Sequence, residues 1–262
     1  MDSLLLTMPD TANTPLRKTR PFIERPSICV PLVAADFAEA RAQVVRLAAK
    51  EPDFIEVRLD YLAGLTTETT GELFSALKDL CPVPLLATFR RQEEGGASPL
   101  AEPERVAILK AALASGAVQL VDVELRTSEA ARQELLEAAR RQGVGSVVSY
   151  HDFARTPGLP ELRDLMAELA ATGADILKLA VFPRLPLDSL NLLTVTYEAQ
   201  ANWPDRQLIT MAMGGLGGFT RLAGPFYGSV LSFAVGEKSS APGQPDIDTV
   251  RKLWQNWAVS TE

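Results

Sequence analysis

The sequence is poor in the side chains that most often hold metals, with one histidine and two cysteines in 262 residues. Cys29 and Cys81 lack the close spacing of metal-ligand cysteines, so we expect no metal site. We expect two free thiols in a reducing compartment, the cytoplasm, with a disulfide between them as the alternative. His151 is either a structural hydrogen-bonding group or the one proton-transfer group that a reaction needs.

The sequence also lacks an excess of positive charge and any long apolar run. Its formal net charge of -7 argues against nucleic-acid binding, which favours a basic surface. No stretch reaches about 18 consecutive apolar residues, so no membrane span is expected. Residues 1–26 hold too short an apolar run for a signal peptide. We expect them to form an N-terminal extension, partly flexible or folded as a hairpin that closes the floor of the domain.

From residue 27 to residue 262 the sequence alternates short apolar segments with longer amphipathic ones, and no linker interrupts it. The short segments have the length and composition of strands: 27–33, 53–61, 84–90, 120–125, 145–153, 176–183, 207–214 and 229–236. Helical periodicity marks 36–50, 101–115, 128–142 and 159–172, and Gly116, Gly143 and Gly173 are expected to end three of these helices. Eight such alternations predict a single-domain α/β fold, a (β/α)8 TIM barrel, with an open doubly wound sheet as the alternative.

Two of the predicted strands carry charge on only one face. Glu56, Arg58 and Asp60 alternate with apolar residues in 53–61, and Asp122, Glu124 and Arg126 do so in 120–126. A strand of an open α/β sheet is normally apolar on both faces, because helices cover both. The pattern favours a barrel in which the charged face points inward near the carboxyl ends of the strands, where barrel enzymes have their active sites.

Lys178 and His151 are the residues most indicative of chemistry. Lys178 lies within the apolar segment "DILKLAVFP", and burial favours a neutral amine that can attack a carbonyl to form a Schiff base. A buried ion pair with a barrel carboxylate explains Lys178 equally well. His151 ends the preceding predicted strand, so the two side chains should lie on neighbouring strands near one rim, where a histidine can act as general acid and base.

Arginines and a glycine-rich stretch also fall at the predicted strand ends. Arg58, Arg90 and Arg221 suit an anionic substrate, because a guanidinium binds a carboxylate through two hydrogen bonds. The glycines within 214–218 could cradle a phosphate, and a flexible turn is as consistent with them. Residues 238–245 are too rich in glycine and proline for a helix and predict a loop over the barrel mouth, where Gln244 could bind a ligand.

Together these segments resemble the type I 3-dehydroquinate dehydratases, the dehydroquinases that form a covalent imine. The resemblance runs from about residue 28 to the C-terminal helix. It rests on a set of separated motifs in order: "ICVPL" (28–32), "EVRLD" (56–60), "TFR" (88–90), "EEGG" (93–96), "DVEL" (122–125), "SYHDF" (149–153), "TP" (156–157), "ADILKLAV" (174–181), "TMAMG" (210–214), "TRLAG" (220–224) and "SAPGQ" (240–244). Thr220 stands where the family usually has serine.

The resemblance implies a barrel enzyme of the shikimate pathway that converts 3-dehydroquinate to 3-dehydroshikimate and water without metal or cofactor, and many members are dimers. It implies that Lys178 forms the imine, that His151 is the general acid and base, and that Glu94 orients His151. It also implies a substrate-binding set: Glu56, Arg58, Arg90, Arg221, Ser240, Ala241, Gln244, Met211 and Met213. Of these, Arg221 would pair with the substrate carboxylate and the residues of 240–244 would close the pocket. The methionines are also what an ordinary core would contain.

Two other interpretations remain for comparison with the structure. A class I aldolase also uses a barrel lysine to form an imine, and phosphate binding by the 214–218 glycines would mark it. A barrel retained only for binding or regulation would be expected to have lost the lysine, the histidine or the arginine, and all are present.

Overall fold

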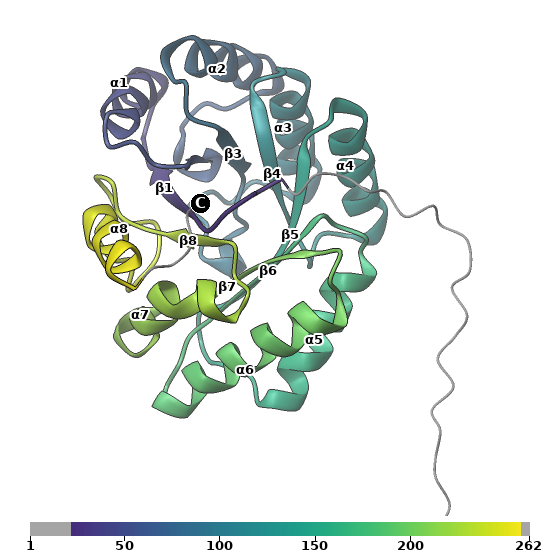
Figure 1. The fold of residues 1–262 in the computed structure, drawn as a ribbon. Coiled ribbons are helices and arrows are strands. Elements are labelled where there is room, and N and C mark those ends of the chain that lie inside the picture. Colours follow the sequence, from purple (N-terminus) through teal and green to yellow (C-terminus); the bar gives the residue numbers. More distant parts are fainter. Residues whose placement is uncertain (1–21, 258–262) are drawn as a thin grey trace, which may run out of the picture.

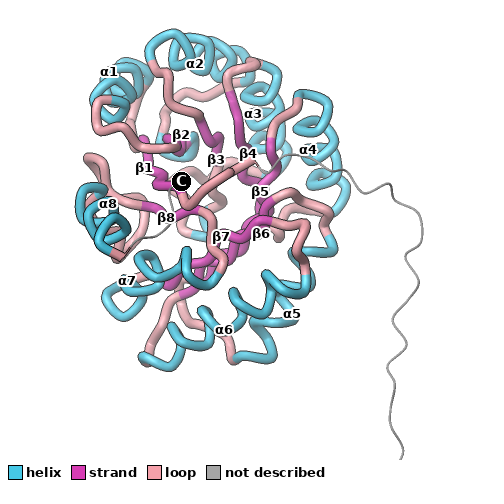
Figure 2. The backbone as a smooth tube through the Cα atoms, in the orientation of Figure 1, coloured by secondary structure: helices cyan, strands magenta, loops and turns pink. Residues whose placement is uncertain are grey.

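The computed structural model describes residues 22–257, which form a barrel of eight parallel strands inside a ring of helices (Figures 1 and 2). The strands are β1 (Ser27–Leu32), β2 (Phe54–Arg58), β3 (Leu85–Thr88), β4 (Val118–Glu124), β5 (Gly145–Asp152), β6 (Ile176–Val181), β7 (Gln207–Ala212) and β8 (Leu231–Phe233). The α-helices are α1 (Phe37–Ala48), α2 (Thr67–Leu80), α3 (Glu102–Ala114), α4 (Glu129–Gln142), α5 (Leu159–Ala171), α6 (Pro186–Asn202), α7 (Gly214–Ala223) and α8 (Ile247–Asn256).

The strands follow one another in chain order around the sheet, and β8 returns to pair with β1. On the other side of β8, the Val230 amide donates to the Leu208 carbonyl across 2.8 Å, which closes the ring toward β7. The (β/α)8 barrel is thereby confirmed and the open doubly wound sheet is wrong. Gly116, Gly143 and Gly173 follow α3, α4 and α5 with φ of 66°, 69° and 79°, so the predicted helix stops are also confirmed.

Several predicted boundaries need correction. The segment 53–61 is a strand only to Arg58, after which Leu59–Tyr61 form a 3-10 helix, η1, and 229–236 contains only the three-residue strand β8. The glycine-rich stretch 214–218 is neither a phosphate loop nor a flexible turn but the first part of α7. Arg126 follows the end of β4 and is exposed, near Glu168 on the outside of the barrel, so it does not share the inward face of Asp122 and Glu124.

The barrel interior changes from apolar to charged along its axis. Inward residues near the amino ends of the strands form an apolar layer, including Phe54, Leu86, Leu120, Val147 and Ile176. Two residues further along their strands stand Glu56, Thr88, Asp122, Ser149 and Lys178, all buried. The alternate residues pack outward against the helices, as Ile55, Val57, Val121 and Val123 do. The one-sided charge of β2 and β4 therefore results from a barrel with an apolar floor and a polar mouth.

The predicted extension, residues 1–26, lies outside the described part of the chain except for its last five residues. Ile23 is buried in the apolar floor layer, where its amide donates to Gln207 Oε1 at 3.2 Å and its carbonyl accepts from Gln207 Nε2 at 2.6 Å. Cys29 and Cys81 are buried free thiols. Between residues 22 and 257, no helix is long and apolar enough to cross a membrane.

Candidate active site

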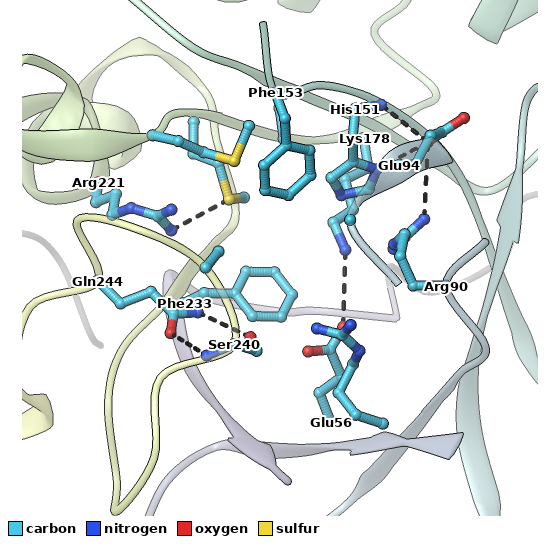
Figure 3. Close-up of a pocket in the computed structure, with 16 residues that line it drawn as sticks. Glu56, Arg90, Glu94, His151, Phe153, Lys178, Arg221, Phe233, Ser240 and Gln244 are labelled. Atoms are coloured by element: carbon cyan, nitrogen blue, oxygen red, sulfur yellow. Dashed lines mark hydrogen bonds and ion pairs between the residues drawn. The ribbon is translucent and has the colours of Figure 1, made fainter. Parts of the chain in front are cut away.

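One pocket opens at the carboxyl ends of the strands, and it brings every predicted site residue together (Figure 3). Its lining residues are Glu56, Arg58, Arg90, Glu94, Gly95, His151, Phe153, Lys178, Ala180, Met211, Met213, Arg221, Phe233, Ser240, Ala241 and Gln244. Arg221 and the 240–244 loop lie on one side of it, and His151, Glu94 and Arg90 lie on the other. Phe153 and Phe233 also line the pocket, although no sequence pattern marked them as site residues.

The Lys178 side chain projects from β6 toward two buried carboxylates, those of Asp122 and Glu56. Its Nζ atom lies 2.8 Å from Asp122 Oδ2 and 3.9 Å from Glu56 Oε1, and its side chain is 3% exposed. The ring of Phe233 lies 4.5 Å from Nζ, close enough for a cation–π contact. Lys178 therefore takes part in a buried ion pair. This is one of the two interpretations of Lys178 that the sequence left open. This ion pair is compatible with imine formation, because the lysine amine can attack a carbonyl after it has lost one proton.

His151, at the end of β5, is oriented by Glu94 from the 3-10 helix η2 (Gln92–Glu94). Glu94 Oε2 accepts from the His151 backbone amide at 3.0 Å and lies 3.1 Å from Nδ1. When Glu94 is ionised its oxygen can only accept, so Nδ1 carries the ring proton and Nε2 is left as a base. Burial, followed by the positive charges of Arg90 and Lys178, holds the pKa of His151 well below its ordinary value. The resting imidazole is neutral.

Glu94 is itself an unusual carboxyl group. Burial raises its pKa from 4.5 to about 7, although Arg90 acts in the opposite direction. One of its oxygens, Oε1, is buried and has no hydrogen-bond partner among the described residues. The charge of Glu94 therefore changes near neutral pH, in direct contact with the only histidine.

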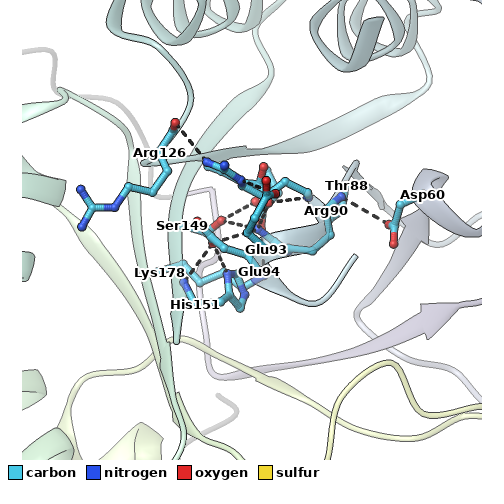
Figure 4. A network of polar contacts seen from close by, with 12 residues as sticks. Asp60, Thr88, Arg90, Glu93, Glu94, Arg126, Ser149, His151 and Lys178 are labelled. Carbon is cyan, nitrogen blue, oxygen red and sulfur yellow. Dashed lines mark hydrogen bonds and ion pairs between the residues drawn. The ribbon is translucent and has the colours of Figure 1, made fainter. Parts of the chain in front are cut away.

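Arg90 lies just after β3, and most of its guanidinium hydrogen bonds go to other side chains of the protein (Figure 4). Its guanidinium donates to Asp122 Oδ2 at 2.9 Å, to Glu124 Oε1 at 3.2 Å and to Ser149 Oγ at 2.8 Å. Burial would lower the pKa of Arg90, but the two carboxylates raise it above its ordinary value. Asp122 and Glu124 lie on the charged inward face that strand periodicity predicts, but neither they nor Ser149 were among the predicted site residues.

Arg221 differs from the other arginines of the pocket because it has no carboxylate partner within residues 22–257. It lies on α7 and is 2% exposed. It donates to Met211 Sδ at 3.3 Å and to the Pro242 carbonyl at 3.4 Å, and its Nε atom has no partner. Burial lowers its pKa to about 10, so it remains a cation at neutral pH. A buried cation with unused donors is suited to an anionic group of a ligand.

The loop 238–245 has neither helix nor strand, as predicted, and its residues Ser240, Ala241 and Gln244 line the pocket. Gln244 accepts from the Ser240 amide at 3.0 Å and donates to Ser240 Oγ at 3.2 Å, so the loop is closed on itself. The Gly214 amide donates to the Pro242 carbonyl at 3.0 Å, which ties the loop to α7. A side chain at Gly243 would lie 2.4 Å from the Gly214 carbonyl oxygen, so only glycine permits this approach. Met211 and Met213 form a buried wall below the loop.

The fold and the pocket define the class of the protein: a (β/α)8-barrel protein with a lysine, a histidine and unused arginine donors at its mouth. The family model for type I 3-dehydroquinase matches residues 28–259. The chain belongs to that family. It is 40% identical over 236 residues to the 3-dehydroquinate dehydratase of Geobacillus thermodenitrificans, a match covering 88% of this chain and 90% of that protein. It is 35% identical over 230 residues to that of Salmonella agona, covering 87% and 91%.

Solved structures agree with the sequence relatives. The 3-dehydroquinate dehydratase of Geobacillus kaustophilus superposes with a TM-score of 0.86 at 38% identity, covering 91% of this chain and 93% of that one. The type I enzyme of Clostridium difficile, solved with covalently modified comenic acid, gives 0.85 at 31% identity and covers 91% and 94%. A 3-hexulose-6-phosphate synthase at 18% identity and a TM-score of 0.54 shares the fold alone.

Proposed function

We propose that this chain dehydrates 3-dehydroquinate to 3-dehydroshikimate and water, as a hydro-lyase of the shikimate pathway that works through a lysine imine. The observation that carries the proposal is the placement of Lys178 and His151 in one buried pocket, with Glu94 on the histidine. Membership in the type I 3-dehydroquinase family supports the substrate and the reaction.

The pocket offers the substrate a place for each polar group. The carboxylate of 3-dehydroquinate would pair with Arg221, whose donors have no carboxylate partner among residues 22–257. Glu56, Arg58 and Arg90 would contact substrate hydroxyls from the opposite side. Ser240, Ala241 and Gln244 would cover the bound molecule, and Met211 and Met213 would supply an apolar wall. An anionic, hydroxylated ring matches this division of charged and apolar groups.

The reaction begins at Lys178, which must give up a proton before it can attack a ketone. Burial would raise the pKa of Asp122, but Arg90 and Lys178 hold it well below its ordinary value. Asp122 therefore stays ionised. It positions the Lys178 side chain and does not take up the proton that Lys178 loses. The free amine adds to the C3 ketone, and two protons from the lysine nitrogen pass to the ketone oxygen. That oxygen leaves as water, which forms the iminium.

The iminium makes the next proton transfer possible, because it withdraws electrons from C2. Nε2 of His151 removes the C2 proton, and an enamine forms. The enamine expels the C1 hydroxyl, and the same His151 returns its proton so that the hydroxyl leaves as water. A second water then hydrolyses the imine and restores Lys178. One histidine can perform both transfers because it ends each turnover in the neutral state in which it began.

The aldolase interpretation has less support. It required the glycines of 214–218 to cradle a phosphate, but these residues form the start of α7. The Gly214 amide, which would face such an anion, already donates to the Pro242 carbonyl. A barrel without catalysis is disfavoured because lysine, histidine and arginine all line the pocket.

We also propose that the protein is a cytoplasmic homodimer. Among residues 22–257, most of the exposed large apolar side chains lie at or on α6, on α7 and in the segment 224–257 that follows. We call this surface the apolar face: Leu185, Leu187, Leu190, Tyr197, Leu216, Phe219, Phe226, Tyr227 and Trp257. Large exposed apolar patches mark association sites, and homodimer interfaces are the most apolar class. The reduced, buried cysteines support a reducing compartment.

The imine is tested by trapping it. Incubation with 3-dehydroquinate and sodium borohydride should give a reduced adduct on Lys178, located by peptide mass mapping. The matched control is Lys178→Arg, which keeps a positive charge beside Asp122 but cannot form an imine. An adduct on another lysine, or turnover with no adduct in the unmodified sequence, would overturn the mechanism.

A further inference from the structure

Asp60 is buried next to the pocket, and its carboxylate contacts three other residues: Arg58, Arg90 and Ala97. Its two oxygens accept from Arg58 Nε at 2.8 Å and from Arg58 Nη2 at 2.7 Å, a two-pronged ion pair. Oδ1 also accepts from the Arg90 backbone amide at 3.3 Å, and Oδ2 accepts from the Ala97 backbone amide at 3.0 Å. The Asp60 side chain is 0% exposed and does not line the pocket.

Arg90 and Ala97 are the two ends of the segment that carries Glu94, which we call the Glu94 loop (residues 90–97). Inside it, the amides of Glu94 and Gly96 donate to the Arg91 carbonyl, at 3.1 and 2.9 Å. A side chain at Gly96 would lie 1.9 Å from the Arg90 carbonyl oxygen, so the loop depends on this close approach. Asp60 therefore holds both ends of a tightly folded loop from the side of β2.

Glu124 holds the same loop from the opposite side, because its Oε1 atom accepts from the Arg91 amide at 2.8 Å and from Arg90 Nη1 at 3.2 Å. Glu124 fixes only the beginning of the loop. Of the two carboxylates, Asp60 is the one that joins the beginning of the loop, its end and a pocket arginine. The carboxylate that pairs with Arg58 is thus also in contact with both ends of the loop that carries Glu94.

We propose that Asp60 is a positioning residue that sets the substrate-binding Arg58 and the Glu94–His151 pair in one fixed arrangement. Removing its negative charge would release two parts of the site at once: the arm that binds substrate and the loop that orients the base. The part of this proposal that concerns substrate binding by Arg58 rests on the proposed function. The effect on Glu94 and His151 exists in the protein without any ligand.

A comparable aspartate at the other end of the barrel provides the control. Asp53, just before β2, accepts from Arg25 Nη2 at 2.6 Å and from the Ile28 amide at 2.7 Å, so it too joins an arginine to a backbone amide. It lies on the floor side, away from the pocket residues. Asp53→Asn and Asp60→Asn therefore remove the same kind of interaction at opposite ends of one strand.

The test uses the single histidine as a reporter. His151 faces Glu94 from η2, Lys178 from β6, Asp122 from β4, and Arg58 and Arg90 from the ends of β2 and β3. In Asp60→Asn the loosened loop should admit water, so the titration midpoint of His151, followed by NMR in the free protein, should rise toward the ordinary value. In the same variant we expect KM about tenfold higher, the usual scale for a lost charged hydrogen bond, and kcat lower as well.

Two further variants separate the parts of the proposal. Arg58→Lys should raise KM and leave the His151 midpoint unchanged, because it retains Asp60 and its contacts with the loop. Asp53→Asn should lower the midpoint of thermal unfolding and leave both KM and the His151 midpoint unchanged. If Asp60→Asn fails to fold, Asp60→Glu keeps the charge but moves its oxygens, and it should shift the same two measurements.

A His151 midpoint that stays unchanged in a folded Asp60 variant would overturn the proposal, whatever happens to stability. A shifted midpoint in a protein that does not turn over 3-dehydroquinate would instead count against the proposed function and leave Asp60 as the holder of the loop.

Discussion

At the level of single residues, the contact between His151 and Glu94 couples two buried groups whose pKa values move in opposite directions. The pKa of His151 falls because burial disfavours its charged form, and the pKa of Glu94 rises to about 7 for the same reason. Both shifts favour the neutral forms of the two groups. At neutral pH the site therefore contains an uncharged base supported by a carboxyl group close to its own titration point.

The pair predicts how stability changes with pH. Glu94 has a raised pKa, so its contribution is present below about pH 4.5 and is lost as the pH rises through about 7. His151 has a lowered pKa, so its contribution is present above about pH 6.5 and is lost as the pH falls through its folded value. Between these limits the two dependences oppose each other and partly cancel.

Glu94→Gln should remove one of these two dependences. The amide can still accept a hydrogen bond from His151 but does not titrate, so only the histidine dependence remains. Below about pH 6.5 the free energy of unfolding should then fall more steeply with decreasing pH than in the parent protein, by on the order of 3 kcal/mol over the window. Urea unfolding at a series of pH values measures this. Parallel curves for the two proteins would contradict the assignment of the raised pKa to Glu94.

Arg221 provides a second prediction at this scale. Arg221→Lys retains a positive charge but loses the two-pronged geometry that a carboxylate requires. We expect KM for 3-dehydroquinate to rise roughly tenfold to a hundredfold, with a smaller change in kcat. Steady-state kinetics measures both, and thermal unfolding checks that the variant is folded. An unchanged KM would mean that the substrate carboxylate binds elsewhere.

At the level of elements, α7 joins the pocket to the barrel wall. It carries Arg221, it receives the 238–245 loop at Gly214, and its Gly217 packs on the end of β7. A side chain at Gly217 would lie 2.2 Å from the Ala212 carbonyl oxygen, a distance that neither backbone can relieve without moving. Gly217 thus serves close helix–strand packing rather than anion binding, whereas a Cβ added at Gly215 or Gly218 would meet no atom within 4 Å.

Two alanine substitutions in α7 should therefore have opposite effects. Gly217→Ala should destabilise the protein by about 1–3 kcal/mol through overpacking and should weaken substrate binding, because the helix holds Arg221. Gly218→Ala has no atom within 4 Å of the new methyl group, so the better helix former should stabilise by about 0.5–1 kcal/mol. Urea unfolding and KM give both answers. Equal effects would show that packing against β7 does not position α7.

At the level of the whole molecule, the distribution of apolar surface is uneven. The apolar face on α6 and α7 contrasts with the rest of the helix ring, where exposed large apolar residues are isolated, as Val45 is on α1. The two helices are neighbours in Figure 1. A second copy of the chain would cover this apolar face with the same exposed apolar side chains.

Phe219→Glu should disrupt the proposed dimer, because it puts a charge at an exposed position of the apolar face (54% exposed). Analytical ultracentrifugation should show a dimer for the parent protein and a monomer for the variant. The matched control is Val45→Glu on α1, which has a similar exposure of 48% and should leave the dimer intact. A monomeric parent protein would reject the dimer outright.

The sequence by itself determined the barrel and the set of residues at its mouth. Alternating segments give parallel strands and outer helices, and the charged residues at every second position of β2 and β4 place Glu56 and Asp122 inside. Strand periodicity is a local property, so it can be read from neighbouring residues. The separated sequence motifs also mark Lys178, His151 and Arg221, because each motif can be recognised without knowledge of its contacts.

Only the tertiary structure decided how these groups are paired. Three of these pairings join residues that are 30 or more positions apart in the sequence. Asp122 accepts hydrogen bonds from Lys178 and from Arg90, and Asp60 accepts one from the Arg90 amide in the Glu94 loop. The same is true of α7, where glycine is read locally as flexibility but is required by a close approach to Ala212. Pairing distances and burial set the pKa values of Glu94 and His151, and these arise when distant strands meet in one ring.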